Sequence, residues 1–235
     1  MPVSLPMRER ADDAKRRRLD GFLAGRDPVA LGLSGLAEDA ELVGSLALAG
    51  IEVEWDVVRA SRGGGDLSGP AAALRRAQGL LPPRALLNRS HLKALCLAVA
   101  DDGSLRRVAL ARADGPPAAA PDRIEARLAA LGDWFGADSI SALVPAAAGA
   151  LALVRLVEIA PLERGNGRLS RLAAAHVMSS RGAPRPILVA ADSERLAAAL
   201  SAAFRMDTTP LVALLEEASS RALDVMLQAL ESGLV

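Results

Sequence analysis

The apolar residues of this chain recur mainly at the spacing of α-helices. Between residues 36 and 60, apolar side chains return every three or four positions, which places them on one helical face. Residues 139–158 are apolar on almost every side, as is typical of a central, buried helix. The pattern predicts helices over 8–22, 36–60, 71–78, 85–99, 122–135, 139–158, 167–180, 193–204 and 209–231.

One segment departs from this periodicity. Residues 103–121 alternate apolar and basic side chains and are rich in turn-forming residues, so we expect a short β-hairpin or flap there. The sequence shows no internal repeat and no long linker. It therefore predicts an all-α fold with an N-terminal helical extension over 1–35 and one helical domain over 36–235 that carries the flap about 103–121.

Composition narrows the class of protein. Apolar residues make up 51% of the chain and aromatic residues only 2%, so we expect a core of Leu, Ala and Val in closely packed helices. The formal net charge is zero, which argues against a nucleic-acid partner. Cys96 is the only cysteine and excludes an intrachain disulfide; we expect it to be buried.

Targeting signals are weak in this sequence. The first twenty residues lack the apolar stretch of a secretory signal. The longest apolar run, 142–154, is interrupted by Pro145 and is too short to span a membrane. We expect a cytoplasmic protein with no membrane partner.

The stretch "GNGRLSR", residues 165–171, carries the clearest candidate chemistry. Gly165 and Gly167 allow a tight turn that exposes backbone N–H groups at the start of a helix, where the helix dipole favours an anion. Arg168 and Arg171 lie one turn apart and can face the same phosphates. Taken alone, the pattern is also compatible with an ordinary turn at the start of a helix.

The surrounding residues extend the pattern. "APLERGNGRLSR", residues 160–171, resembles the HPFx[D/E]GNGRxxR signature of the Fic (Fic/Doc, Fido) family. Residues 86–99, 103–121, 124–135 and 193–215 resemble, in order, the segments that flank this signature in the family. The resemblance implies a Fic-like helical bundle with a flap that aligns target proteins. It also implies nucleotide-phosphate binding, for example of ATP, by Gly165, Asn166, Gly167, Arg168 and Arg171.

The chain departs from the signature at the positions that carry the chemistry. The family's first motif residue is a His that acts as general base, and here it is Ala160, so no catalytic residue is assigned. The family's Mg²⁺-binding acid is replaced by Arg164, whose charge can neutralise phosphate but cannot reproduce metal coordination, so Mg²⁺ is doubtful and no metal ligand is assigned. Glu163 is acidic but stands one residue away.

A further departure lies upstream. Many Fic proteins carry an inhibitory helix, [S/T]xxxE[G/N], whose Glu pairs with the second motif Arg. Ser45 and Gly50 match this pattern, but Ala49 stands where the Glu is expected. This loss is compatible with a constitutively active enzyme or with a site in which nothing remains to inhibit.

The two histidines do not restore the lost base. His176 lies eight residues beyond Arg168, roughly 12 Å along the helix, and is expected to be packed or on the surface. His91 stands at the start of its helix, where a structural role is also favoured. No cluster of His, Cys, Asp and Glu has the spacing of metal ligands, and no Ser/His/Asp arrangement is supported.

Three functions follow from these observations. The first is a degenerate Fic-domain protein that binds a nucleotide or polyphosphate and acts through protein partners. The sequence is also compatible with a homo-oligomer. The second is a divergent transferase of the Fic type, for AMPylation or a related transfer to a protein hydroxyl, that uses another base. The third is a structural interaction protein in which "GNGR" only starts a helix and the charged helix over 8–20 makes the contacts.

Overall fold

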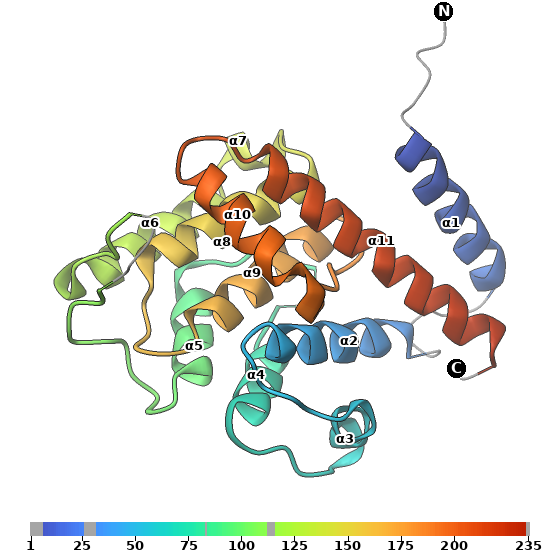
Figure 1. Ribbon diagram of the computed structural model, residues 1–235, viewed down its shortest axis with the longest axis horizontal. Helices are drawn as coiled ribbons and strands as arrows, with labels where there is room; N and C mark the ends of the chain where they lie inside the picture. Colours follow the sequence, from blue (N-terminus) through green and yellow to red (C-terminus); the bar gives the residue numbers. More distant parts are fainter. Residues whose placement is uncertain (1–6, 26–31, 83, 112–115, 234–235) are drawn as a thin grey trace, which may run out of the picture.

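The computed structural model describes residues 7–25, 32–82, 84–111 and 116–233 (Figure 1). These residues form eleven α-helices and no strand, which confirms the predicted all-α class. The helices are α1 (Met7–Leu23), α2 (Leu33–Ala47), α3 (Trp55–Ala60), α4 (Gly69–Gly79), α5 (Arg89–Val99), α6 (Ile124–Phe135), α7 (Asp138–Ser141), α8 (Pro145–Ile159), α9 (Asn166–Ser180), α10 (Ser193–Ala203) and α11 (Thr209–Glu231). Three short 3-10 turns, η1 (Ser61–Gly63), η2 (Pro121–Arg123) and η3 (Ala190–Asp192), precede or connect them.

Helices α8 and α9 lie side by side at the centre of the molecule (Figure 1). One apolar core joins them to α2, α4, α5 and α6, and a second joins them to α10 and α11. Small residues allow the two helices to approach closely, since a Cβ on Gly149 of α8 would lie 2.7 Å from the Cγ of Met178 on α9. The prediction of a central, buried helix over 139–158 is thus confirmed for α8.

The predicted continuous helix over 36–60 is broken. Helix α2 ends before Gly50, which adopts a positive φ of 69°. The N–H of Ile51 donates to the carbonyl of Leu46 and the N–H of Gly50 to that of Ala47, the two hydrogen bonds of a Schellman termination. Glycine supplies this left-handed turn at low cost, and periodicity alone does not register it.

Two other helices begin later than predicted. Helix α5 starts after Asn88, whose side chain accepts the His91 N–H (3.0 Å) while His91 Nδ1 accepts the Asn88 N–H (3.3 Å). This reciprocal capping explains why the helix does not start at residue 85 and gives His91 a structural role. Helix α8 begins at Pro145, a residue suited to a first helical turn, and the short helix α7 precedes it.

The predicted β-hairpin over 103–121 is not formed within its described residues, 103–111 and 116–121; residues 112–115 lie outside the described part of the chain. Two backbone N–H groups of this segment bond to the end of α8 and to the residues that follow it. The N–H of Arg106 donates to the Pro161 carbonyl (2.9 Å), and that of Ala119 to the Glu158 carbonyl (3.2 Å). These partners leave the two halves of the segment without a ladder of their own.

Helix α1 lies against the C-terminal half of α11 (Figure 1). Its contacts are polar: Lys15 Nζ donates to Ser220 Oγ (2.8 Å) and pairs with Asp224 (2.8 Å), and Arg18 pairs with Glu231 (2.7 Å). The charged segment predicted over 8–22 is therefore a helix that is joined to the domain. None of the helices in the described residues has both the length and the hydropathy needed to cross a bilayer.

Candidate functional site

The loop between α8 and α9 carries the motif residues. Ala160 ends α8 with a positive φ of 44°, and Gly165, with φ 91°, precedes the first residue of α9. Leu162 is buried in the larger core and anchors the loop from below. Asn166 closes the loop, because its Oδ1 accepts the Leu162 N–H (2.9 Å) and its Nδ2 donates to the Leu162 carbonyl (2.7 Å).

The closed loop leaves backbone donors at the N-terminus of α9. The first helical hydrogen bond runs from the Leu169 N–H to the Gly165 carbonyl (2.9 Å), so the preceding N–H groups of Asn166, Gly167 and Arg168 are outside the helical ladder. Gly167 is exposed. The dipole of a helix makes such a terminus attractive to an anion.

Arg168 lies beneath this loop and is 5% exposed. Its guanidinium faces Gly165, where a Cβ would lie 2.9 Å from Nη2 and 3.2 Å from Val99 Cγ1; the φ of 91° at this position favours glycine. Its only acidic neighbour in the described residues within ion-pair distance is Asp101, with Nη2 and Oδ1 separated by 3.9 Å. Its buried Nη1 has no hydrogen-bond partner there. Burial lowers the pKa of Arg168, and attraction by Asp101 opposes the shift.

Arg171 points to a different neighbour. Its Nε donates to Ser45 Oγ (3.0 Å) and its Nη2 to the Ser45 carbonyl (2.6 Å), which ties α9 to the end of α2. Burial, together with repulsion from Arg168, lowers the pKa of Arg171 to about 10, and attraction by Glu41 opposes this change. Arg171 is still a cation at neutral pH. Its Nε and Nη2 are engaged by α2, whereas its Nη1 lies beside Gly167, 3.0 Å from where a Cβ on that glycine would stand.

The end of α2 carries the residues that the resemblance assigns to an inhibitory helix, and it contacts Arg171. Ser45 contacts the second motif arginine, whereas Ala49 and Gly50 lie in the turn beyond the helix and are exposed. Without a carboxylate at position 49, Ser45 supplies the contact with Arg171.

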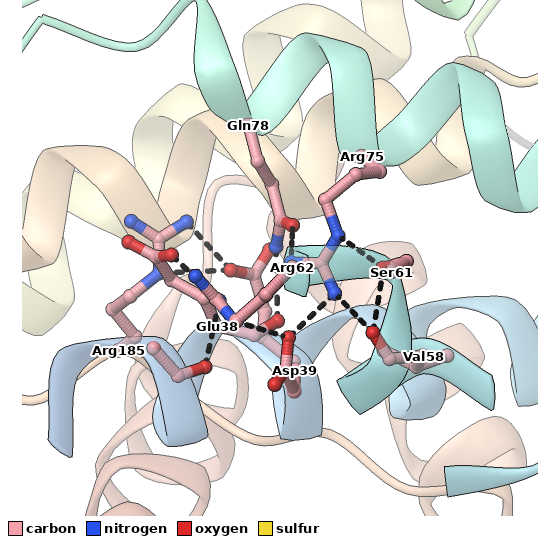
Figure 2. Close-up of polar contacts among 10 residues, drawn as sticks. Glu38, Asp39, Val58, Ser61, Arg62, Arg75, Gln78 and Arg185 are labelled. Carbon is pink, nitrogen blue, oxygen red and sulfur yellow. Dashed lines mark hydrogen bonds and ion pairs between the residues drawn. The ribbon is translucent and has the colours of Figure 1, made fainter. Parts of the chain in front are cut away.

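A network of charged residues fixes α2 in this position (Figure 2). The carboxylate of Asp39, which is 1% exposed, accepts from Arg62 Nε (2.9 Å) and from Arg75. Buried Glu41 accepts two hydrogen bonds from Arg185 (2.8 and 2.6 Å), yet desolvation outweighs this cation and raises the pKa of Glu41. Three arginines from distant parts of the chain therefore hold the helix that contacts Arg171.

Ala160, where the resemblance led us to expect a base, is 0% exposed. Arg106, 3% exposed, lies directly over its backbone: Nε donates to the Ala160 carbonyl (2.6 Å), and Nη2 donates to the Ala119 carbonyl and to that of Ile159 (3.4 Å). Burial lowers the pKa of Arg106, and no described carboxylate pairs with it. The methyl group of Ala160 offers no proton chemistry, and the position is covered.

The residues around the loop do not fit a magnesium ion. Arg164 and Glu163 are both exposed, and an arginine at position 164 cannot coordinate a cation. No group of three or more His, Cys, Asp or Glu in the described residues is arranged to hold a metal.

The remaining sequence candidates are structural. His176 is 3% exposed, and its Nε2 lies 2.7 Å from the Ala85 carbonyl, so this nitrogen carries the proton; burial lowers the pKa of the ring. Cys96 is buried, as expected, and burial raises the pKa of its thiol to about 12.

Sequence reasoning missed two residues of the site. Arg106 lay within the alternating pattern that predicted a hairpin, and nothing in that pattern marks one arginine as buried. Asp101 follows helix α5, and its approach to Arg168 depends on how α5 packs against α9. Both belong to segments distant in sequence from the motif, so no local spacing could have identified them.

Comparison with known proteins bears on the fold. No protein-family model matches the chain, and no curated protein matches it in sequence. Solved structures do match. A Caenorhabditis elegans Fic-1 fragment (residues 134–508) has a TM-score of 0.76 at 18% identity over 97% of this chain and 74% of that one. A Fic-domain signalling protein from Bacteroides thetaiotaomicron has 0.73 at 18% identity, over 94% of this chain and 98% of that one.

A more distant match is the Fic protein IbpAFic2, solved in covalent linkage to Cdc42, with a TM-score of 0.54 at 14% identity over 88% of this chain and 70% of that one. At these identities the likeness concerns the backbone arrangement. The order of the helices and the loop between α8 and α9 agree with the expectation from residues 160–171. The chain has the Fic fold.

Proposed function

We propose that this protein binds the phosphates of a nucleotide or another polyphosphate at Gly165–Arg168, and acts through protein partners without transferring the nucleotide. The observation that carries this proposal is the buried Arg168 guanidinium, whose Nη1 has no hydrogen-bond partner among the described residues. A buried cation is costly unless it is paired, and its single acidic neighbour, Asp101, is 3.9 Å away. A bound phosphate would supply the missing acceptors.

Three further features support an anion here. The N–H groups of Asn166, Gly167 and Arg168 precede the first hydrogen bond of α9. The exposed Arg164 adds positive charge at the mouth of the loop. The loop is held in shape by Asn166, so little order has to be created when a ligand binds.

Transfer of the nucleotide is not supported by the residues present. Transfer requires a base to accept the proton of the attacking hydroxyl, and Ala160 cannot do so. Arg164 replaces the acid that would hold the metal, and Arg171 is committed to Ser45. We therefore expect binding of the phosphates without catalysis.

Replacing Arg168 with alanine is expected to weaken polyphosphate binding by at least about tenfold, since charge-assisted hydrogen bonds to phosphate are lost. Isothermal titration calorimetry with ATP, ADP, GTP and inorganic tripolyphosphate measures this change. Arg76→Ala, at an exposed arginine on α4, removes the same charge away from the motif loop, serves as the matched control and should leave the affinity unchanged.

Two results would contradict the proposal. The first is equal affinity of the wild-type and Arg168→Ala proteins, or no binding of any of the four ligands. The second concerns transfer: intact-mass analysis of candidate partner proteins incubated with this protein, ATP and Mg²⁺ is expected to show no added AMP. A mass increase that depends on Arg168 would identify a divergent transferase.

Replacing Asp101 with asparagine is expected to strengthen tripolyphosphate binding by a factor of about 2–5. The Asp101 carboxylate competes with an anion for Arg168, and because Asp101 is 56% exposed, the gain is that of a solvent-screened charge. Calorimetry at low and high salt measures the effect, which should shrink as salt increases. The neighbouring Asp102→Asn is the control, and an equal gain there would mean that only the overall charge matters.

A further inference from the structure

A groove of about 720 Å³ lies between α6 and α8, and Arg168 is not among the residues that line it. Its floor is apolar and is formed by Ala126, Ala130 and Leu131 of α6 with Leu151 and Ile159 of α8. Trp134 lies at one end, partly buried, with its ring against that of Phe135 at a centroid distance of 5.4 Å.

The rim of the groove is positively charged. Arg123 and Arg127 stand one turn apart on the α6 side, and Arg155 faces them from α8. Glu158 is the only acidic lining residue, and it pairs with Arg155 at 2.8 Å. Arg123 has only a loose contact with Asp122 (3.6 Å), where both side chains are exposed. The chain as a whole has a formal net charge of zero, so this excess of arginine is local to the groove.

The shape of the groove favours a peptide segment over a small molecule. Small-molecule sites enclose most of their ligand, whereas this groove is open to solvent along the two helices. From Arg123 to Trp134 the groove follows α6 for roughly 16 Å, the length of about three helical turns. An apolar floor of this length with charged rims is the arrangement that receives an amphipathic helix.

We propose that the α6–α8 groove docks an acidic amphipathic helix of a partner protein. Apolar side chains of the partner pack on Leu131, Leu151 and Trp134, and its carboxylates pair with Arg123 and Arg127. Charge complementarity selects the acidic partner, because a basic segment would meet like charges on the rim. The proposal rests on the proposed function only in that the protein acts through partners, and it does not require a bound nucleotide.

The groove reaches the motif loop. Ile159 and Glu158 line its inner end and directly precede Ala160, and the Glu158 carbonyl accepts the N–H of Ala119. A partner in the groove therefore touches the helix end from which the loop departs.

The first experiment selects peptides from a randomised display library of about 12 residues, the length that fills the groove as a helix. We expect the enriched sequences to carry Asp or Glu on one helical face and large apolar residues on the other. Synthetic copies of the enriched peptides are then titrated into the Trp55→Phe protein, in which Trp134 is the only tryptophan and reports occupation of the groove. Saturable change in its fluorescence is the expected result.

Two variants of the groove test the contacts. Arg127→Glu reverses a rim charge, and Ala130→Arg places a long side chain on the exposed floor; each is expected to weaken peptide binding by about tenfold or more. Arg76→Glu on α4 makes the same charge change at an exposed position outside the groove and should leave binding unchanged.

Three results would overturn the docking proposal. They are enrichment of neutral or basic peptides, the absence of any enrichment, and unchanged peptide binding to Ala130→Arg. Circular dichroism establishes that each variant is folded. Tripolyphosphate binding to the same variants separates the two proposals, because failure of the groove leaves binding at Arg168 intact, and loss of binding at Arg168 leaves peptide docking intact.

Discussion

Replacing Arg106 with methionine is expected to lower the free energy of unfolding by about 3–5 kcal/mol. The buried guanidinium donates to the carbonyls of Ala160 (2.6 Å), Val108 (2.7 Å), Ala119 and Ile159 (3.4 Å). In the variant, the acceptors that lie in the interior lose their donors and have no water to replace them. A buried carbonyl without a partner costs about 1–3 kcal/mol.

Two opposing terms decide the size of this effect. Burial lowers the pKa of Arg106, which shows that desolvation of the cation opposes folding, and methionine removes that cost. Against this, the carbonyls of Ile159 and Ala160 lie at the negative end of the α8 dipole, where a cation is favoured. Because several charge-assisted hydrogen bonds are lost at once, we expect their loss to exceed the desolvation cost that methionine removes, so that the variant is less stable.

Urea denaturation followed by circular dichroism measures the change. Arg107→Met, the exposed neighbouring arginine, is the matched control and should stay within about 0.5 kcal/mol of the wild type. Arg106→Lys should recover only part of the loss, because one ammonium group cannot reach acceptors on both segments. If Arg106→Met unfolds at the same urea concentration as the wild type, the hydrogen bonds of Arg106 contribute no net stability.

Replacing Gly44 with alanine is expected to destabilise the protein by about 2–3 kcal/mol, even though alanine favours helices. A Cβ on Gly44 would lie 1.8 Å from the carbonyl oxygen of Leu188, and a backbone atom cannot move aside as a side chain can. The helix must therefore shift. Because Ser45 follows directly and holds Arg171, we also expect the α2–α9 contact to loosen.

Thermal unfolding measures the loss of stability, and hydrogen exchange at the end of α2 measures the loosening. Gly79→Ala is the control, since a Cβ there meets nothing within 4 Å and its effect should be near zero or slightly stabilising. Equal stability of Gly44→Ala and Gly79→Ala would mean that the close approach of α2 to Leu188 is not maintained in solution.

These two substitutions act at different contacts of the helices that flank the loop. Arg106 fixes the point at which α8 ends and the loop begins, and Gly44 allows α2 to come close enough for Ser45 to bind Arg171. Both residues shape the site without facing the proposed ligand. Loss of either should therefore alter stability more than it alters the identity of the ligand.

The sequence predicted the helices best where their ends carry local signals. Helix α11 begins and ends where predicted, and the Asp207 carboxylate accepts the Thr209 N–H (3.0 Å) at its start. The prediction failed over 36–60, where the spacing of apolar residues continued past Gly50, and at the flap, where alternation suggested strands. In both places a backbone hydrogen bond, invisible to periodicity, decided the structure.

The sequence by itself determined the all-α class, the central helix and the loop at 160–171, because helical spacing and the glycines of "GNGR" act over a few residues. Only the tertiary structure decided how the arginines are used. Arg168 is buried with an unpartnered nitrogen, Arg171 is held by α2, and Arg106 covers Ala160. The physical reason is that the partner of a buried charge is set by packing between segments far apart in the chain, and no local pattern encodes it.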